Sequence, residues 1–274
     1  MNYATPVDGL GANSRPVGHI AVADPAYDAG FRVGGNWALD SCSSLEFVFT
    51  RWESNVEHSI ARQGGANFIR ADLTHPNLAN IAADSLNARA NYDLGLQMFD
   101  LHYKALVWGG DNHFLNYVLG LRYGRLDQDF VATYSINGAT TVDSEIDFNG
   151  FGPRFGLDGE RLLCNGIFLY GRGFLSVLMG EFDVEYIQSN VFAGQQAFTG
   201  FNDDRVVPVL EFELGAGWQS ECGKYRISAG YYFASWFNAI TTQSSITALR
   251  ANNFDDIDQT ITFDGLTTRF EFRF

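Results

Sequence analysis

The amino-acid sequence predicts an all-β fold, an antiparallel up-and-down transmembrane β-barrel. Apolar and polar residues alternate with a period of two, short and long connections alternate along the chain, and aromatic rings gather near the ends of the alternating segments. The 274 residues are 15% aromatic and 18% charged. This composition argues against disorder, because disordered chains combine high charge with few aromatic residues.

The alternation defines about nine strands. It is clearest where the apolar positions of a whole segment share one face of a strand, which a helix would not allow. These segments are residues 113–124, 206–218, 224–234 and 266–274. Weaker strands are expected at residues 31–39, 43–52, 86–104, 143–158 and 164–180. In residues 86–104 the apolar set passes from Leu94, Leu96 and Met98 to Leu101 and Tyr103, which predicts a β-bulge near Phe99.

The connections fall into two classes. The short ones are residues 40–42, 108–112, 159–161 and 220–223, and the long ones are residues 53–84, 127–142, 181–204 and 238–261. Tight turns at one end and extended loops at the other are typical of an outer-membrane barrel.

Residue types on the two faces indicate which face meets lipid. Large rings occupy the apolar face near the strand ends, as in the aromatic girdles of membrane barrels. They are Trp37, Trp52, Tyr117, Tyr123, Trp218, Tyr225, Tyr231 and Phe233. A soluble barrel, with the apolar face inside, remains the alternative, but the low charged fraction disfavours it.

The polar face then lines the lumen. Its charged and titratable residues are Arg32, Glu46, Arg89, Asp93, Asp100, His102, Lys104, Arg122, Arg154, Asp158, Arg172, Glu211, Glu213, Arg226, Arg269, Glu271 and Arg273. Because these charges nearly cancel, the net charge of −14 is assigned to the long loops, with Asp127, Asp129, Asp143, Glu145, Glu181, Asp183, Glu185, Asp203, Asp204, Asp255, Asp256 and Asp258 as examples. The lumen is either a salt-bridged plug or a charged eyelet that selects small ions.

Nine is an odd count, whereas single-chain bacterial barrels have even counts. Counting back from Phe274 places the short turns on the side of the C-terminus. Residues 1–28 are therefore expected to form an external loop that follows a first strand and signal peptide missing from this sequence, and residues 29–274 a barrel of about ten strands in the complete protein. Alternatively, residues 1–28 lie at the surface or supply a strand themselves. No signal peptide is visible in MNYATPVDGLGAN.

Other chemistry finds little support in the sequence. No apolar stretch approaches the roughly 18 residues of a membrane-spanning helix, and the acidic balance makes nucleic acid an unsuitable partner. Gly150, Gly152 and Gly156 have the wrong spacing for a nucleotide loop and are expected to make room inside the barrel. Among the histidines, only His102 is placed for chemistry, and no nucleophile stands beside it.

No cofactor or metal site is expected, and the acidic FDDID segment, residues 254–258, is interpreted as solvated. Three cysteines, Cys42, Cys164 and Cys222, lie in or beside short turns. A bridge between Cys164 and Cys222 stays open, because adjacent turns can exceed the Cα separation of about 7 Å that a disulfide tolerates.

Five segments resemble the Legionella-type major outer membrane protein family of pore-forming barrels. They are GFRVGGNW (30–37), ANYDLGLQMFDLHYK (90–104), GLRYGRL (120–126), DFNGFGPRFGLDG (147–159) and DGLTTRFEFRF (264–274), of which DFNGFGPRFGLDG is the most specific. The resemblance implies a Gram-negative-type outer membrane, a passive-diffusion or structural role, and no catalytic residues. It also implies that Phe274 is the C-terminal signal read by the barrel-insertion machinery.

The expected function is a passive pore-forming or structural component of the outer membrane, without enzymatic activity. Its expected partners are outer-membrane lipids and lipopolysaccharide, and its oligomeric state stays open. The alternatives are a surface-displayed binding or adhesion barrel with acidic loops, and a soluble β-barrel that binds an apolar ligand. Because about eight strands leave an interior filled by side chains while open porins need roughly 16 to 18, a ten-stranded barrel should conduct poorly.

Overall fold

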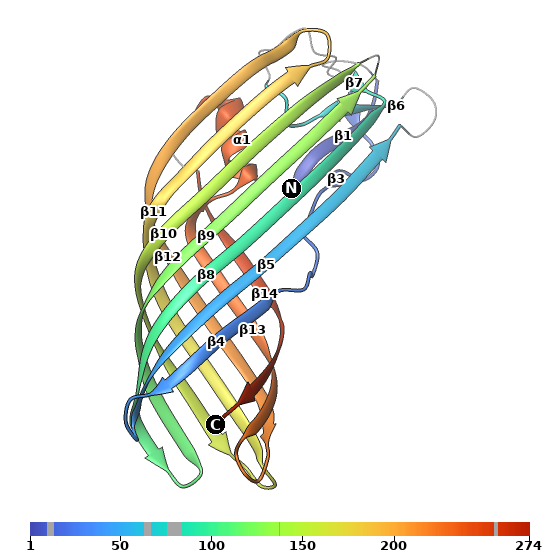
Figure 1. Ribbon diagram of the computed structural model, residues 1–274. Coiled ribbons are helices and arrows are strands. Elements are labelled where there is room, and N and C mark those ends of the chain that lie inside the picture. Colours follow the sequence, from blue (N-terminus) through green and yellow to red (C-terminus); the bar gives the residue numbers. More distant parts are fainter. Residues whose placement is uncertain (10–13, 63–66, 76–83, 137, 255–256) are drawn as a thin grey trace.

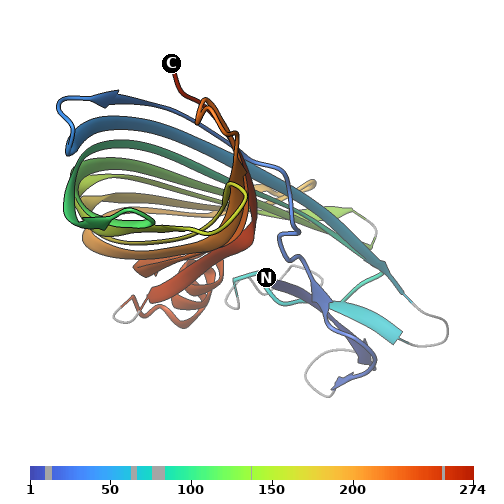
Figure 2. The same cartoon turned by 90° about the horizontal axis from the view of Figure 1, so that it is seen from below.

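Nine antiparallel strands form one sheet that curves into an open barrel (Figure 1, Figure 2). The structure, a computed structural model, describes residues 1–9, 14–62, 67–75, 84–136, 138–254 and 257–274. Along the sheet, the strands are β4 (Phe31–Ala38), β5 (Ser43–Ala61), β8 (Asn87–Gly110), β9 (His113–Ser135), β10 (Ala139–Leu162), β11 (Ile167–Asn190), β12 (Gly194–Gln219), β13 (Tyr225–Ile240) and β14 (Asp258–Phe272). The predicted all-β antiparallel fold is confirmed.

The outer face of the large sheet changes from apolar to polar between one row of outward-facing residues and the next. One row of directly paired outer residues is apolar: Phe49, Phe99, Tyr123, Phe151, Met179 and Val206. The next outer row towards the long-loop end is polar: Arg51, Gln97, Arg125, Asn149, Glu181 and Asp204. Below this boundary, apolar outer positions continue to the short turns, as on β9 from Leu115 to Tyr123, a length that suits a tilted membrane strand.

At the C-terminal edge, the predicted assignment of the two faces holds. Phe270 and Phe272 are 68% and 52% exposed on the outer face, while Arg269 on the opposite face is half-buried and lies within 3.6 Å of Glu213. The predicted ring positions follow this pattern except at Trp52. That indole lies on the inner side, in edge contact with Phe263 across 5.5 Å between ring centroids.

Strand β8 shows why the predicted bulge near Phe99 is wrong. Its pairing with β9 continues without a register shift from Asn87 to Leu106, and the irregularity lies between Leu106 and Trp108. Leu94, Leu96 and Met98 are buried on the inner face, whereas Leu101 and Tyr103 are exposed on the outer face. The side chains of β8 therefore alternate regularly between the two faces. Above the boundary the apolar side chains are on the inner face, and below it they are on the outer face.

Two predicted long loops are strand instead. Residues 127–142 belong largely to the hairpin of β9 and β10, and residues 181–204 to that of β11 and β12. Their outer faces carry most of the acidic residues assigned to loops, with Asp203 on the inner face opposite Phe182. Their inner faces carry an apolar core that includes Phe130, Ile146 and Val184. The alternation persists, but with polar residues outside. Asp255 and Asp256 lie outside the described residues.

A smaller sheet covers part of this upper inner face. It consists of β1 (Asn2–Asp8), β2 (Arg15–Pro16), β3 (Ala21–Val22), β6 (Asn67–Ala71) and β7 (Asp84–Ser85), with β1 paired to β6 (Figure 1). The hydroxyl of Tyr134 on β9 donates to the Tyr3 carbonyl at 2.6 Å, and that of Tyr186 on β11 donates to the Leu73 carbonyl at 3.1 Å. The small sheet is thereby fixed to the inner wall of the large one.

Helix α1 (Thr242–Ala251) packs against the same inner face. It begins with a capping box between Thr241 and Ser244, and it buries Ile246 and Leu249 against the sheet core. In the part of the chain that the structure describes, no helix is long and apolar enough to cross a membrane. Both α1 and the small sheet therefore pack against the inner face of the large sheet at its long-loop end.

Gln128 on β9 anchors α1, and its replacement is expected to loosen the helix. Its amide donates to the Ile240 carbonyl at 2.8 Å, and its carbonyl oxygen accepts from the Thr242 amide at 3.3 Å. Gln128→Leu leaves these buried groups unpaired and should lower the free energy of unfolding by roughly 1–3 kcal/mol. Hydrogen exchange of the α1 amides should accelerate with it. The control Val131→Thr, on the outer face of β9, should change stability by under about 0.5 kcal/mol.

Candidate functional site: the charged lumen

Below the apolar upper core, the inner face carries a chain of buried ion pairs. We define the central ion cluster as Asp100, Arg122, Arg154 and Glu211, which come from β8, β9, β10 and β12. Arg122 is 1% exposed; its guanidinium is bidentate to Asp100, at 2.6 and 2.8 Å, and donates to Glu211 at 2.7 Å. Because a buried unpaired charge costs several kcal/mol, each member depends on the others.

Arg154 joins the central ion cluster to an aromatic stack. It contacts Glu211, donates to the Ser176 hydroxyl at 3.0 Å, and lies 4.1 Å over the ring of Phe174. The imidazole of His102 is parallel to the same ring at 5.8 Å, and its Nε2 accepts from Arg154 at 3.0 Å. Phe174 occupies the space where Gly156 would carry a Cβ. Gly156 therefore makes room inside the barrel for the stack.

A second group, the basal ion cluster, consists of Glu46, Lys104, Asp158 and Arg172 on β5, β8, β10 and β11. The Lys104 ammonium lies 2.7 Å from Glu46 and 3.0 Å from Asp158, and Arg172 lies 3.2 Å from Asp158. Glu46 also contacts His102 Nδ1 at 3.2 Å, which connects the two clusters. Negative and positive side chains thus alternate from Glu46 to Arg172, and their ion pairs join four strands.

Glu213 on β12 collects partners from both edges of the sheet. Arg32 of β4 approaches it at 3.4 Å and Arg269 of β14 at 3.6 Å, while the Tyr170 hydroxyl donates to it at 2.9 Å. Arg32 therefore reaches across the lumen from the first strand of the large sheet. Nearby, Arg226 contacts Glu160 and lies 4.0 Å over the ring of Phe168.

The structure places most of the predicted lumen residues on the inner face. These are Arg32, Glu46, Asp100, His102, Lys104, Arg122, Arg154, Asp158, Arg172, Glu211, Glu213, Arg226, Arg269 and Glu271. Arg273 follows β14 and contacts Glu271 at 3.5 Å. Phe274 is fully exposed at the chain end.

Arg89 and Asp93 correct the prediction, because both lie on the outer face of β8. Arg89 pairs with Glu57 on the outside, and Asp93 accepts hydrogen bonds there from Asn55 and Asn91. Both residues stand above the boundary, where the outer face is polar and the inner face apolar.

Sequence reasoning missed Glu160, Tyr170 and Tyr232. Glu160 had been assigned to a turn, but β10 extends to Leu162, and the parity of Arg154 and Asp158 would have placed Glu160 on the inner face. Tyr232 donates to Glu211, and Arg32 lies 5.2 Å over its ring. Its neighbour Tyr231 stands on the outer face, which parity also indicates.

The three cysteines lie outside this site. Cys42, Cys164 and Cys222 are each free and exposed in the turns of the short-turn end, so the bridge between Cys164 and Cys222 that the sequence left open is not formed.

The polar outer wall above the boundary concentrates like charges. Asp129 lies directly between Asp93 and Glu145 of the neighbouring strands, and Glu145 lies opposite Glu185. Partial burial, followed by repulsion from Asp147, Asp93 and Asp143, raises the pKa of Asp129. Burial and then repulsion from Asp129 likewise raise the pKa of Glu145. The folded state therefore binds protons more tightly than the unfolded chain at these positions.

The double variant Asp129→Asn/Glu145→Gln should be more stable than the wild type at pH 7, by roughly 0.2–1 kcal/mol. Because both pKa values are raised in the fold, the wild type gains stability as the pH falls through them, and the difference should vanish below about pH 4, the ordinary carboxyl value, where the folded and unfolded states are both protonated. Equilibrium unfolding in lipid vesicles at several pH values measures this. A difference that grows towards acid pH would contradict the assignment.

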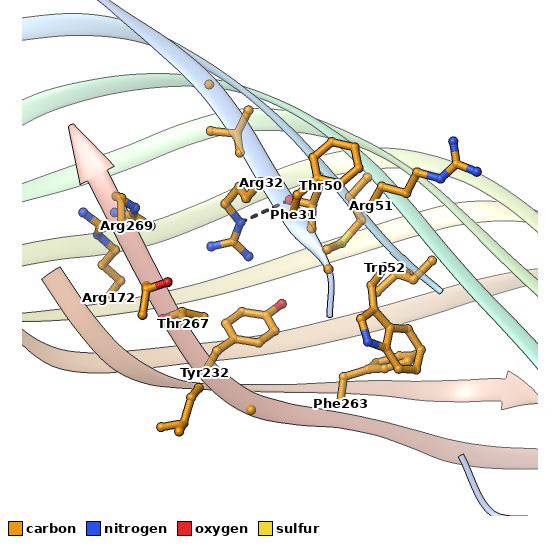
Figure 3. A pocket seen from close by; sticks show the side chains of 18 of the residues that line it. Phe31, Arg32, Thr50, Arg51, Trp52, Arg172, Tyr232, Phe263, Thr267 and Arg269 are labelled. Carbon is orange, nitrogen blue, oxygen red and sulfur yellow. Dashed lines mark hydrogen bonds between the residues drawn. The ribbon is translucent and has the colours of Figure 1, made fainter. Parts of the chain in front are cut away.

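A cavity of about 2360 Å³ runs along the inner side of β4, β5, β13 and β14. Figure 3 shows Arg32 and Thr50 on one side of it and Tyr232, Thr267 and Arg269 on the other. At its upper end, Trp52 and Phe263 meet, while Arg51 points away. Side chains of both signs line the cavity.

A family described as Legionella pneumophila major outer membrane protein precursor matches residues 3–274. No curated protein matches the chain.

Proposed function

This chain belongs to the Legionella major outer membrane protein family and is located in the outer membrane, and we propose that its barrel is a structural component with a lumen that its own side chains close. The observation that carries the proposal is the central ion cluster. Arg122 on β9 meets Glu211 on β12, with β10 and β11 between them in the sheet, and both side chains are 1% exposed. A lumen bridged in this way leaves no wide water path at that level.

The size of the barrel supports the same proposal. Barrels of about eight strands have interiors that side chains fill, and aqueous channels accompany 16 to 18 strands. Here α1 and the small sheet occupy the long-loop end, and the basal ion cluster lies towards the short turns. A solute entering from the long-loop end meets α1 and the small sheet, and towards the short turns the basal ion cluster lines the wall of the cavity beside β4 and β14.

Passive diffusion of small polar solutes is the second candidate function. The cavity of about 2360 Å³ beside β4 and β14 favours it, because charges of both signs line that space. Trp52 of β5 and Phe263 of β14, which both line the cavity, meet across it with 5.5 Å between their ring centroids. This route would therefore pass small ions at most.

Planar-bilayer conductance distinguishes the two functions. The wild-type protein should give no sustained channel steps in concentrated KCl, whereas Arg122→Ala/Arg154→Ala, which empties the middle of the lumen, should give steps. Heat-modifiable migration on gels verifies that both proteins are folded. Sustained steps of equal size from the two proteins would refute the structural proposal and favour diffusion.

The proposal includes no catalytic role and no cofactor. His102 is held between Glu46 and Arg154, and no serine or cysteine hydrogen-bonds to it among the described residues. The proposed partners of the protein are membrane lipids and lipopolysaccharide, which contact the apolar belt, and the insertion machinery, which contacts the exposed Phe274. The apolar belt is the set of apolar outer positions between the boundary and the short turns, such as those from Leu115 to Tyr123 on β9. If the protein is instead a binding barrel, its acidic surface lies on the outer face of the strands above the boundary, where Asp129, Glu145 and Glu185 stand, and not on loops. We call this surface the acidic outer wall.

A further inference from the structure

The large sheet ends in two edges that face each other across the cavity. β4 is its first strand and β14 its last. In the described residues, β4 pairs with β5 alone and β14 with β13 alone. Both edges therefore leave a row of backbone amide and carbonyl groups without sheet partners. The space between them is the cavity described above.

Both edges lie within the apolar belt. Val33 and Trp37 of β4 are 61% and 76% exposed on the outer face, and Leu266 and Phe270 of β14 are 87% and 68% exposed. In hydrocarbon, each unpaired backbone group costs several kcal/mol, so an open sheet edge is not tolerated there. Something must pair with these edges when the protein is in a membrane.

The direction of the strands identifies the partner. Every neighbouring pair in the nine-stranded sheet is antiparallel, so the first and ninth strands run the same way, both towards the short-turn end (Figure 1). Direct closure would create one parallel pair in an otherwise antiparallel barrel. One additional strand that runs in the opposite direction gives every strand antiparallel neighbours.

We propose that the space between β4 and β14 receives one further β-strand, antiparallel to both, supplied by the same polypeptide ahead of Met1. Met1 lines this cavity together with both edge strands, and its backbone nitrogen donates to the Ala23 carbonyl within the pairing of β1 and β3. A chain joined to Met1 therefore leaves the small sheet directly into the cavity. Residues 1–28 then connect the added strand to β4.

The side chains around the cavity define the chemistry of that strand. At Gly35 of β4 and Gly265 of β14, an added Cβ would meet no atom within 4 Å, so the faces of the two edge strands are uncovered at these points. Arg32 and Arg269 point inward, and both approach Glu213, while Arg269 also lies 3.9 Å from Glu271. The strand should alternate apolar residues towards lipid with small or polar residues towards these charges, over about 9–11 residues.

Cysteine pairs in the protein isolated from its own outer membrane test the added strand. In a background with Cys42, Cys164 and Cys222 changed to serine, Val33→Cys is combined with Leu266→Cys, Thr268→Cys or Phe270→Cys. Neighbouring strands lie about 4.8 Å apart, within disulfide reach, whereas strands separated by one other lie about 9.6 Å apart, beyond it. No pair should form a disulfide, and a bis-maleimide of about 10 Å should join at least one. The matched control Ala229→Cys/Thr268→Cys, paired across β13 and β14, should oxidise readily.

The intact mass of the same preparation identifies the source of the strand. A single chain heavier than 30.4 kDa by at least about 1 kDa, the mass of roughly ten residues, supports the proposal. A disulfide between β4 and β14 would overturn the added strand. A mass of 30.4 kDa, or a second polypeptide cross-linked to Val33→Cys, would overturn its origin ahead of Met1. None of these outcomes depends on conductance.

Discussion

Arg122→Met is expected to lower the free energy of unfolding by about 3–5 kcal/mol, because it leaves Asp100 and Glu211 as buried charges without their main partner. Arg122 is 1% exposed and contacts both carboxylates. Arg154 remains beside Glu211, but it also donates hydrogen bonds to Ser176 and His102. Equilibrium unfolding in lipid vesicles measures the loss, and hydrogen exchange should show faster opening of β9 and β12.

Two further variants separate charge from packing at this position. Arg122→Lys keeps the charge but cannot be bidentate to Asp100, so it should recover only part of the loss. In Asp100→Asn/Arg122→Met/Glu211→Gln, all three charges are gone, and the triple variant should be more stable than Arg122→Met alone. Strict additivity of the three single changes would contradict a coupled cluster.

The sequence predicted which face each residue occupies better than it predicted what that face contacts. Leu94 and Leu101 are the same residue type seven positions apart on β8, yet Leu94 is buried on the inner face in a core that includes Ala248 of α1, and Leu101 is exposed on the outer face in the apolar belt. Alternation shows which residues share a face of the strand. Whether lipid or water contacts that face depends on where the membrane ends. The misplaced bulge, Arg89 and Asp93 all follow from that difference.

The partners inside the lumen were also beyond sequence reasoning. Arg122 and Glu211 are 89 positions apart, and their contact depends on the tilt and curvature of four strands. Parity places both side chains inside the barrel but does not pair them. The pairing of β1 with β6 joins segments about 60 residues apart. Both strands are short and lack alternation, so no local sequence pattern predicts this pairing.

Leu119→Arg is expected to destabilise the folded protein by about 2–4 kcal/mol, because it puts a charge near the middle of the apolar belt. Leu119 is 46% exposed on the outer face of β9, halfway between Leu115 and Tyr123. Its direct cross-strand neighbours, Tyr103 and Phe155, are also exposed on that face and offer the guanidinium no anion. Equilibrium unfolding in lipid vesicles measures the cost.

Val131→Arg is the matched control, on the same strand and face but above the boundary. Its cross-strand neighbours are Asn91 and Asp143, in the acidic outer wall, so the new charge should be neutral or stabilise by up to about 1 kcal/mol. The two variants add the same side chain, so they differ in the medium around it. Equal costs at both positions would mean that water, and not hydrocarbon, surrounds the lower half, and the large apolar side chains exposed there would then need another covering.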